Sequence, residues 1–275
     1  MKNKFPVDWI IIGAMKSGTT SLLHMIGQHP DIFALNEVQY YNKFYPNAGY
    51  YIDKFKDHQD KVCGEKSPSL MYNENFIKRM HDDNPDYKLI IILRNPIDRA
   101  YSHYQMNKEN FNTNLSFPLC LDGNKSYIRY KSEYHIPIRM IRNYFPPNQL
   151  YITTYERFFD DATKNIQDIF DFLGVKKFNE VKEKKMVVGK HCTDEKVANE
   201  IAKLTSYRNK NYIYQSPAWL DTTKEINRLK KKCMKLGYEK LDAELRAALY
   251  NKYFKTDVKK LSNLLKVDFN KVWDC

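Results

Sequence analysis

Cysteine, long apolar runs and internal repeats are scarce or absent in this chain of 275 residues. The five cysteines are odd in number, widely spaced and never form CxxC, so the sequence suggests neither a disulfide framework nor a zinc site. We interpret them as unpaired thiols in a reducing compartment. They are Cys63, Cys120, Cys192, Cys233 and Cys275. Because no repeat, linker or low-complexity tract occurs, nothing in the sequence indicates a repeat architecture.

No segment is apolar for long enough to cross a membrane. The N-terminal sequence MKNKFPVDWIIIGA contains an apolar run that is too short for a signal peptide or a membrane anchor, and it passes directly into Gly and Lys. We therefore expect a cytoplasmic protein without membrane insertion. On that expectation, Asn114-Leu-Ser and Asn124-Lys-Ser are chance matches to the glycosylation pattern.

Basic residues outnumber acidic ones. The chain has 45 Lys and Arg against 33 Asp and Glu, a formal net charge of +12, which favours anionic partners such as nucleotides, nucleic acid or polyanionic glycans. With 43% hydrophobic residues it can bury a substantial core. We expect a single domain over residues 1–275, with a core at about 8–175 and a Lys-rich, mostly helical part at 176–275.

Short β-branched runs alternate with stretches of helical spacing. The runs lie at residues 9–13, 87–93 and 149–154. Their alternation with helices predicts an α/β fold, with a P-loop-like parallel β-sheet, helices on both faces and a helical C-terminal part. Helices are predicted over 19–28, 75–82, from Pro96 onward, 127–144 and 241–265, while 111–125 is predicted as a surface loop, a poorly ordered segment or part of an acceptor site.

The segment after the first predicted strand has the form of a phosphate-binding loop. Gly13-Ala-Met-Lys16-Ser17-Gly18-Thr19-Thr20 leads from a strand into a helix, where backbone N–H groups and the helix N-terminus can hold a phosphate. A P-loop for nucleoside triphosphates requires GxxxxGK[ST], but Thr19 stands at the position of its lysine. The lysine lies inside the loop instead, at Lys16.

A second departure from the nucleoside-triphosphate pattern is Arg94. It follows the predicted strand 87–93, at the position of a metal-binding acid in P-loop enzymes. A cation there indicates a second anionic group rather than Mg²⁺. The ligand 3′-phosphoadenosine 5′-phosphosulfate (PAPS) carries a 5′-phosphosulfate and a separate 3′-phosphate. We expect Arg94 to hold the second group, and the 5′ end to be held by Lys16, Ser17, Gly18, Thr19 and Thr20.

Four ordered segments resemble the PAPS-dependent sulfotransferases, most of all the heparan-sulfate (N-/3-O-) group with its bacterial and viral relatives. IIGAMKSGTTSL looks like the family's 5′-phosphosulfate loop, and LIIILRNPIDRAYSHY looks like its 3′-phosphate element. The second match implies that Arg94 and Ser102 bind the 3′-phosphate. Asn36-Glu37-Val38-Gln39-Tyr40-Tyr41-Asn42 resembles the segment with the catalytic base, which implies that role for Glu37. Gly64-Glu65-Lys66-Ser67-Pro68 resembles the segment with an active-site lysine, which implies Lys66.

The resemblance covers about 8–104 and 127–175. It includes FPPNQLYITTYERFFDDATKNIQDIFDFLGV, which resembles a family segment that packs the fold. Beyond residue 175 it is poor. The family's basic Lys-Gly-Arg-like loop is represented here only by Lys235-Leu-Gly237-Tyr238, so no residue is assigned to cover the adenine.

The resemblance implies transfer of a sulfonate from PAPS to a hydroxyl or amine, with adenosine 3′,5′-bisphosphate (PAP) as product and no metal requirement. Glu37 would accept the acceptor's proton, Lys16 would neutralise the leaving oxygen, and Lys66 would hold the sulfonate or the leaving group. A glycan or a small molecule is the favoured acceptor, and we expect neither a nucleic-acid partner nor membrane insertion. The oligomeric state stays open.

Two alternatives stay open. A P-loop nucleotide or small-molecule kinase would share the strand, loop and helix, although Thr19 and Arg94 count against it. A non-catalytic polyanion-binding protein would explain the charge, but it explains none of the four segments.

Overall fold

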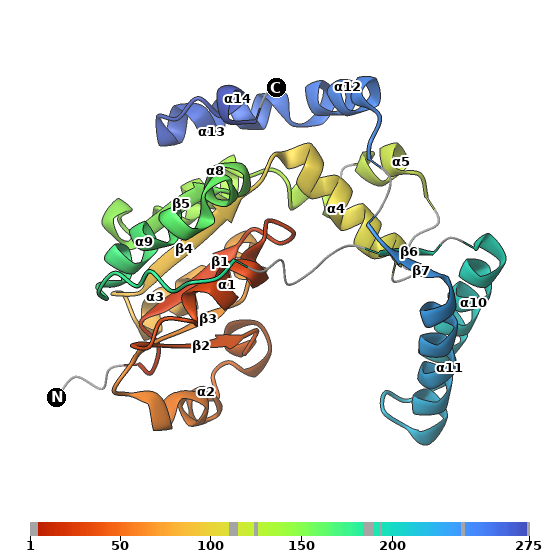
Figure 1. The fold of residues 1–275 in the computed structure, drawn as a ribbon, viewed down its shortest axis with the longest axis horizontal. Coiled ribbons are helices and arrows are strands. Elements are labelled where there is room, and N and C mark those ends of the chain that lie inside the picture. Colours follow the sequence, from red (N-terminus) through yellow and green to blue (C-terminus); the bar gives the residue numbers. More distant parts are fainter. Residues whose placement is uncertain are drawn as a thin grey trace.

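A five-stranded parallel sheet forms the centre of the structure, a computed structural model that describes residues 5–109, 115–123, 126–183, 190–192, 194–237 and 240–273. The strand order is β2-β3-β1-β4-β5, and helices lie on both faces (Figure 1). The predicted α/β fold with a helical C-terminal part is therefore confirmed. The strands are β1 (Trp9–Gly13), β2 (Ile32–Asn36), β3 (Val62–Lys66), β4 (Lys88–Leu93) and β5 (Leu150–Thr154).

The central strand is apolar on both faces because each face meets its own layer of helices. Ile10 and Ile12 of β1 belong to one buried cluster, with residues of α3 (Glu74–Asp83), α7 (His135–Ile141) and α13 (Lys255–Leu265). Trp9 and Ile11 belong to the other, with residues of α1 (Thr19–Ile26) and α9 (Ala162–Leu173). Such burial on both sides is what a continuous apolar run in a parallel strand predicts.

The helices differ from the predicted ranges in three places. The range 127–144 splits into α6 (Tyr127–Tyr130) and α7, because the Asp257 carboxylate accepts hydrogen bonds from Tyr134 N and His135 N at the start of α7. The range 241–265 splits into α12 (Ala243–Tyr253) and α13 at the buried Phe254. Within 111–125, residues 111–114 and 124–125 lie outside the described residues, and part of the rest is a helix, α5 (Phe117–Leu121).

That short helix exists because it packs on a neighbour. Phe117 of α5 contacts Tyr101 and Tyr104 of α4 (Pro96–Glu109), with ring centroids 5.0 and 5.3 Å apart. The loop prediction for 117–121 was therefore wrong. The remaining helices are α2 (Ala48–Phe55), α8 (Tyr155–Asp160), α10 (Glu195–Asn211), α11 (Pro217–Cys233) and α14 (Phe269–Val272).

Helices α10 and α11 form a hairpin that projects from the body (Figure 1). Two short antiparallel strands, β6 (Lys190–Cys192) and β7 (Met234–Leu236), pair at the base of the hairpin. The register sets the backbone of Cys192 opposite Met234. Cys233 at the end of α11 is disulfide-bonded, whereas Cys63 and Cys120 are not part of a disulfide. The prediction of unpaired cysteines is thus wrong for Cys233. A single domain over 1–275 stays a prediction.

Candidate active site

The loop of residues 14–18 joins β1 to α1, as the sequence predicts. Gly18 precedes α1 with φ 82°, and a Cβ atom there would lie 2.7 Å from the Phe159 ring, so the position requires glycine. Ser17 is fully buried, and its Oγ has no hydrogen-bond partner among the described atoms. A buried hydroxyl without a partner beside a helix N-terminus fits an incoming phosphate oxygen.

Arg94 follows β4 and reaches this loop. Its Nη1 donates to the Lys16 carbonyl at 3.2 Å, and its guanidinium lies over the Tyr155 ring, 4.9 Å from the centroid. Tyr134 Oη donates to the Arg94 carbonyl at 2.9 Å and fixes the backbone at the end of the strand. The structure therefore brings Arg94 and the loop together at the carboxyl edge of the sheet.

Lys66 connects two other predicted residues. Its Nζ lies 2.9 Å from Glu37 Oε1 and 3.1 Å from Thr20 Oγ1. The Lys66 side chain is 4% exposed and that of Glu37 is 45% exposed, so the carboxylate lies at the surface and the ammonium beneath it. Parallel pairing of β3 with β1 and β2 brings these side chains together, because Lys66 is in register with Ile11 and Asn36.

Ser102 lies in α4 and is buried, 7% exposed. It neighbours His103 and shares its helix with Arg99. Its assignment to the 3′-phosphate stays a prediction, as do the roles of the other candidate residues.

Glu65 is a site residue to which the sequence analysis gave no role. It is fully buried and accepts hydrogen bonds from Tyr51 Oη (2.7 Å), Ser67 Oγ (2.9 Å) and Val38 N (3.1 Å). Burial raises the pKa of Glu65, and these three donors act in the opposite direction. Since all three partners donate, the geometry suits a carboxylate. Glu65 thus fixes the backbone one residue beyond Glu37.

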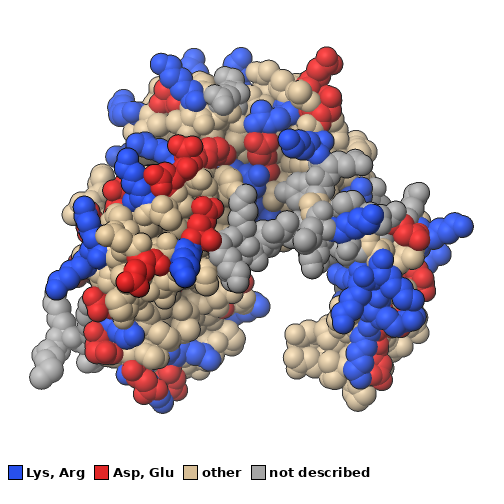
Figure 2. Space-filling view, viewed as in Figure 1, with Lys and Arg blue, Asp and Glu red and all other residues tan. Residues whose placement is uncertain are grey.

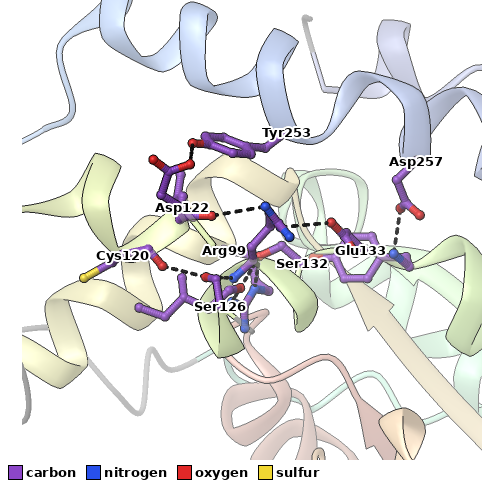
Figure 3. Close-up of polar contacts among 12 residues, drawn as sticks. Arg99, Cys120, Asp122, Ser126, Ser132, Glu133, Tyr253 and Asp257 are labelled. Carbon is purple, nitrogen blue, oxygen red and sulfur yellow. Dashed lines mark hydrogen bonds and ion pairs between the residues drawn. The ribbon is translucent and has the colours of Figure 1, made fainter. Parts of the chain in front are cut away.

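Two buried cations, Arg99 and Lys131, were also missed. Arg99 is fully buried; its Nε donates to Ser132 Oγ and its Nη2 to the Ile128 carbonyl, both at 2.7 Å (Figure 3). Its Nη1 has no hydrogen-bond partner among the described atoms. Lys131 is 5% exposed and lies over the Tyr72 ring at 3.9 Å, and burial lowers its pKa to about 8. No sequence pattern separates these two from surface cations.

The pKa of His103 reflects the combined effect of these charges. Burial and, in decreasing order, the charges of Arg99, Lys16 and Lys131 together lower its pKa to about 3. Lys16 comes from the loop after β1, so the loop and the buried cations act on one imidazole. Burying several like charges is unfavourable unless an anion compensates for them. The arrangement is therefore suited to an anionic ligand.

A profile of the sulfotransferase domain matches residues 6–249, which is most of the chain. The chain belongs to the sulfotransferase family. Family membership favours the sulfotransferase interpretation over the kinase and polyanion-binding alternatives.

Similar proteins in this family include both glycan-modifying and membrane-associated sulfotransferases. The chain is 28% identical over 187 residues to mouse heparan sulfate glucosamine 3-O-sulfotransferase 6, covering 64% of this chain and 54% of that protein. It is 30% identical over 183 residues to human heparan sulfate glucosamine 3-O-sulfotransferase 5, covering 60% and 53%. It is 34% identical over 119 residues to the membrane-associated sulfotransferase kil1 of Dictyostelium discoideum, covering 41% and 25%. The chain thus spans about half the length of these relatives, or less.

Among solved structures, the sulfotransferase from Alicyclobacillus acidocaldarius has a TM-score of 0.69 at 21% identity, covering 97% of this chain and 98% of that one. The likeness supports the same α/β fold for this sulfotransferase. In the described part of the chain, no helix has both the length and the hydropathy needed to cross a membrane.

Proposed function

We propose that this sulfotransferase transfers a sulfonate from PAPS to a hydroxyl or amine of a carbohydrate, and releases PAP. The observation that carries the proposal is the bridge made by Lys66, whose ammonium contacts both Thr20 and Glu37. These contacts hold the Glu37 carboxylate beside the start of α1, which supports a base and an anion site at the same edge of the sheet.

The donor site is supported by groups that suit two separate anions. The buried Ser17 hydroxyl, the N-terminus of α1 and Lys16 would hold the 5′ end. Arg94 and Ser102 would hold the 3′-phosphate. The orphaned Ser17 Oγ is the atom that most directly fits such a ligand, because a phosphate oxygen would accept its hydrogen bond.

The proposed transfer needs one base and several cations. When bound, PAPS supplies a sulfonate whose transfer breaks the S–O bond to its phosphate. Glu37, with its half-exposed side chain, accepts the proton of the attacking hydroxyl or amine. Lys66 lies between that carboxylate and the loop, where it can contact sulfonate oxygens, and Lys16 opposes the negative charge that grows on the leaving phosphate. We expect these residues to suffice without a metal ion.

A carbohydrate acceptor is supported by the similarity of this chain to heparan sulfate glucosamine 3-O-sulfotransferases. In this chain, Lys131 lies among the Tyr72 and Tyr127 rings, 3.9 and 5.0 Å from their centroids. A cation among aromatic faces suits a sugar that carries acidic groups.

The test is transfer of labelled sulfonate from PAPS to heparan sulfate by the wild type and by Glu37→Gln. We expect Glu37→Gln to lower kcat by roughly 10²-fold to 10⁴-fold, because it removes the general base. Binding of PAP should stay unchanged. Glu180→Gln, a change to an exposed glutamate, serves as the matched control and should retain wild-type activity. Equal activity in wild type and Glu37→Gln would contradict the assignment of the base, and no transfer to any carbohydrate would contradict the acceptor class.

A further inference from the structure

The hairpin of α10 and α11 is set apart from the body that holds the transfer site (Figure 1). Each helix has 17 residues, which is about 25 Å of length. The hairpin is held by its own small buried cluster, and at its base both helices contact β6, which also contacts α4. The cluster consists of Ile201, Ile226, Leu229 and Cys233. Residues 212–216, which join the two helices, therefore form a tip at the far end.

The tip exposes large apolar and aromatic side chains. Ile213 is 83% exposed and Tyr214 70%, and close by Tyr207 is 55% and Leu220 44% exposed. Ile213 has the highest exposed fraction of the large apolar side chains that the structure describes. Several such residues gathered at one point indicate a contact surface rather than scattered surface positions.

The aromatic side chains at the tip are held in place by one another. The Tyr214 ring meets the Trp219 ring edge-on, with centroids 4.8 Å apart. The Arg208 guanidinium lies 4.6 Å over the same indole and donates to Thr223 Oγ1 at 2.9 Å. These contacts order the tip while leaving Ile213 and Tyr214 in solvent.

The hairpin is also strongly basic. Residues 194–237 contain ten Lys and Arg against five Asp and Glu. Lys210 is exposed next to the tip. Lys224 lies further along α11 and pairs with Asp221 at 2.9 Å, and Lys230, Lys231 and Lys232 follow it. Figure 2 shows Lys and Arg gathered over the hairpin, and mostly uncharged surface with some Asp or Glu toward its tip. The surface is thus apolar at its end and cationic behind it.

We propose that this tip docks on an anionic lipid bilayer. Ile213 and Tyr214 enter the boundary between headgroups and acyl chains, where aromatic side chains with one polar end are favoured. Lys210 remains at the headgroups, where a cation strengthens binding by roughly fivefold. A soluble polyanion would use the lysines but would leave Ile213 in water. The contact is peripheral and requires no membrane-spanning helix.

The test is flotation of the full chain with vesicles of phosphatidylcholine alone or mixed with phosphatidylserine. We expect binding to the mixed vesicles, weakening as salt is raised, and a loss of at least about tenfold in the double variant Ile213→Ser, Tyr214→Ser. Trp219 supplies a second readout: Trp9 and Trp273 are buried, so a blue shift of tryptophan emission on adding vesicles reports the tip.

The matched control is Leu119→Ser with Ile136→Ser, which removes two exposed apolar side chains elsewhere and should bind like the wild type. Absence of vesicle binding overturns the proposal, even if heparin binds. So does vesicle binding that the tip variant retains, or a dimer in solution that buries the tip. Because the hairpin lies outside the transfer site, sulfonate transfer to a soluble acceptor should be unchanged in the tip variant, which separates this proposal from the proposed function.

Discussion

At the scale of single residues, the buried cations near the loop determine what the site can hold. In the described structure, the hydrogen bonds of Arg99 go to a hydroxyl, a carbonyl and a histidine ring. These neutral partners take up only some of its hydrogen bonds and do not cancel its charge. Burial lowers the pKa of Arg99, and the charge of Arg94 contributes in the same direction. An anion bound nearby would relieve this repulsion, so ligand binding and stability should rise together.

His103 makes this electrostatic environment measurable. Its folded-state pKa of about 3 lies below the unfolded value, so the unfolded chain binds one more proton between those two pKa values. The stability associated with His103 is therefore present above the unfolded pKa and is lost as the pH falls. From about pH 7 to about pH 5, we expect wild type to lose about 2 kcal/mol of unfolding free energy more than His103→Gln.

Urea unfolding at the two pH values measures the difference. His24→Gln, a change to an exposed histidine, is the control and should follow the wild type. Parallel pH dependence in wild type and His103→Gln would show that the ring is not buried among these cations.

At the scale of secondary-structure elements, Glu65 holds the base in place. Its carboxylate joins the end of β3 to Val38 N beside Glu37 and to Tyr51 of α2. Glu37 has φ 51°, a left-handed conformation that a glutamate adopts only when its surroundings hold it there. The hydrogen bond from Val38 N to Glu65 is one contact that does so.

We expect Glu65→Gln to lower kcat more than about tenfold while the dissociation constant of PAP stays unchanged, because an amide cannot accept all three hydrogen bonds. Tyr51→Phe removes one donor but keeps the bond from Val38 N. It should cost about 1–3 kcal/mol of stability and leave kcat close to wild type. Steady-state kinetics and PAP titration of both variants separate positioning from general destabilisation. Equal loss of kcat in both variants would argue against the positioning role.

The same elements show what the sequence could predict about the fold. The runs that became β1, β4 and β5 are apolar and continuous, so their strands were predicted to within one residue. β2 and β3 were missed. In β3, Gly64 leaves room for the Trp9 indole, since a Cβ atom there would lie 2.0 Å from the ring, and Glu65 and Lys66 are charged residues at buried positions. Tertiary contacts, rather than strand propensity, select these residues.

The candidate site could be predicted only in part. Lys16, Ser17 and Arg94 follow apolar strands and carry recognisable spacing, and Glu37 and Lys66 came from the family resemblance. Glu65, Arg99 and Lys131 could not be assigned to the site from the sequence, because their roles depend on burial and on partners distant in sequence. A charged residue gives no periodic signal that separates a buried position from a solvated one.

At the scale of the whole molecule, the chain has a net charge of +12, and two separate groups of basic residues contribute to it. One lies near the carboxyl edge of the sheet, where the half-buried Lys16 and the buried Arg99 and Lys131 lower the pKa of His103. The other is exposed on α11. Exposed charges are screened at ordinary ionic strength, and buried ones are screened much less. Salt should therefore weaken vesicle binding by the hairpin more than PAP binding by the site.

The proposed donor site is tested by the thermal midpoint of the wild type, Lys16→Ala and Arg94→Ala with and without PAP, in the absence of metal. At a hundredfold excess over its dissociation constant, PAP should stabilise the wild type by about 2.7 kcal/mol. Each variant should reduce that effect, while Lys252→Ala, a change to an exposed lysine, should not. A PAP effect that persists in both site variants, or stabilisation by ATP with Mg²⁺ but not by PAP, would contradict the proposed donor site.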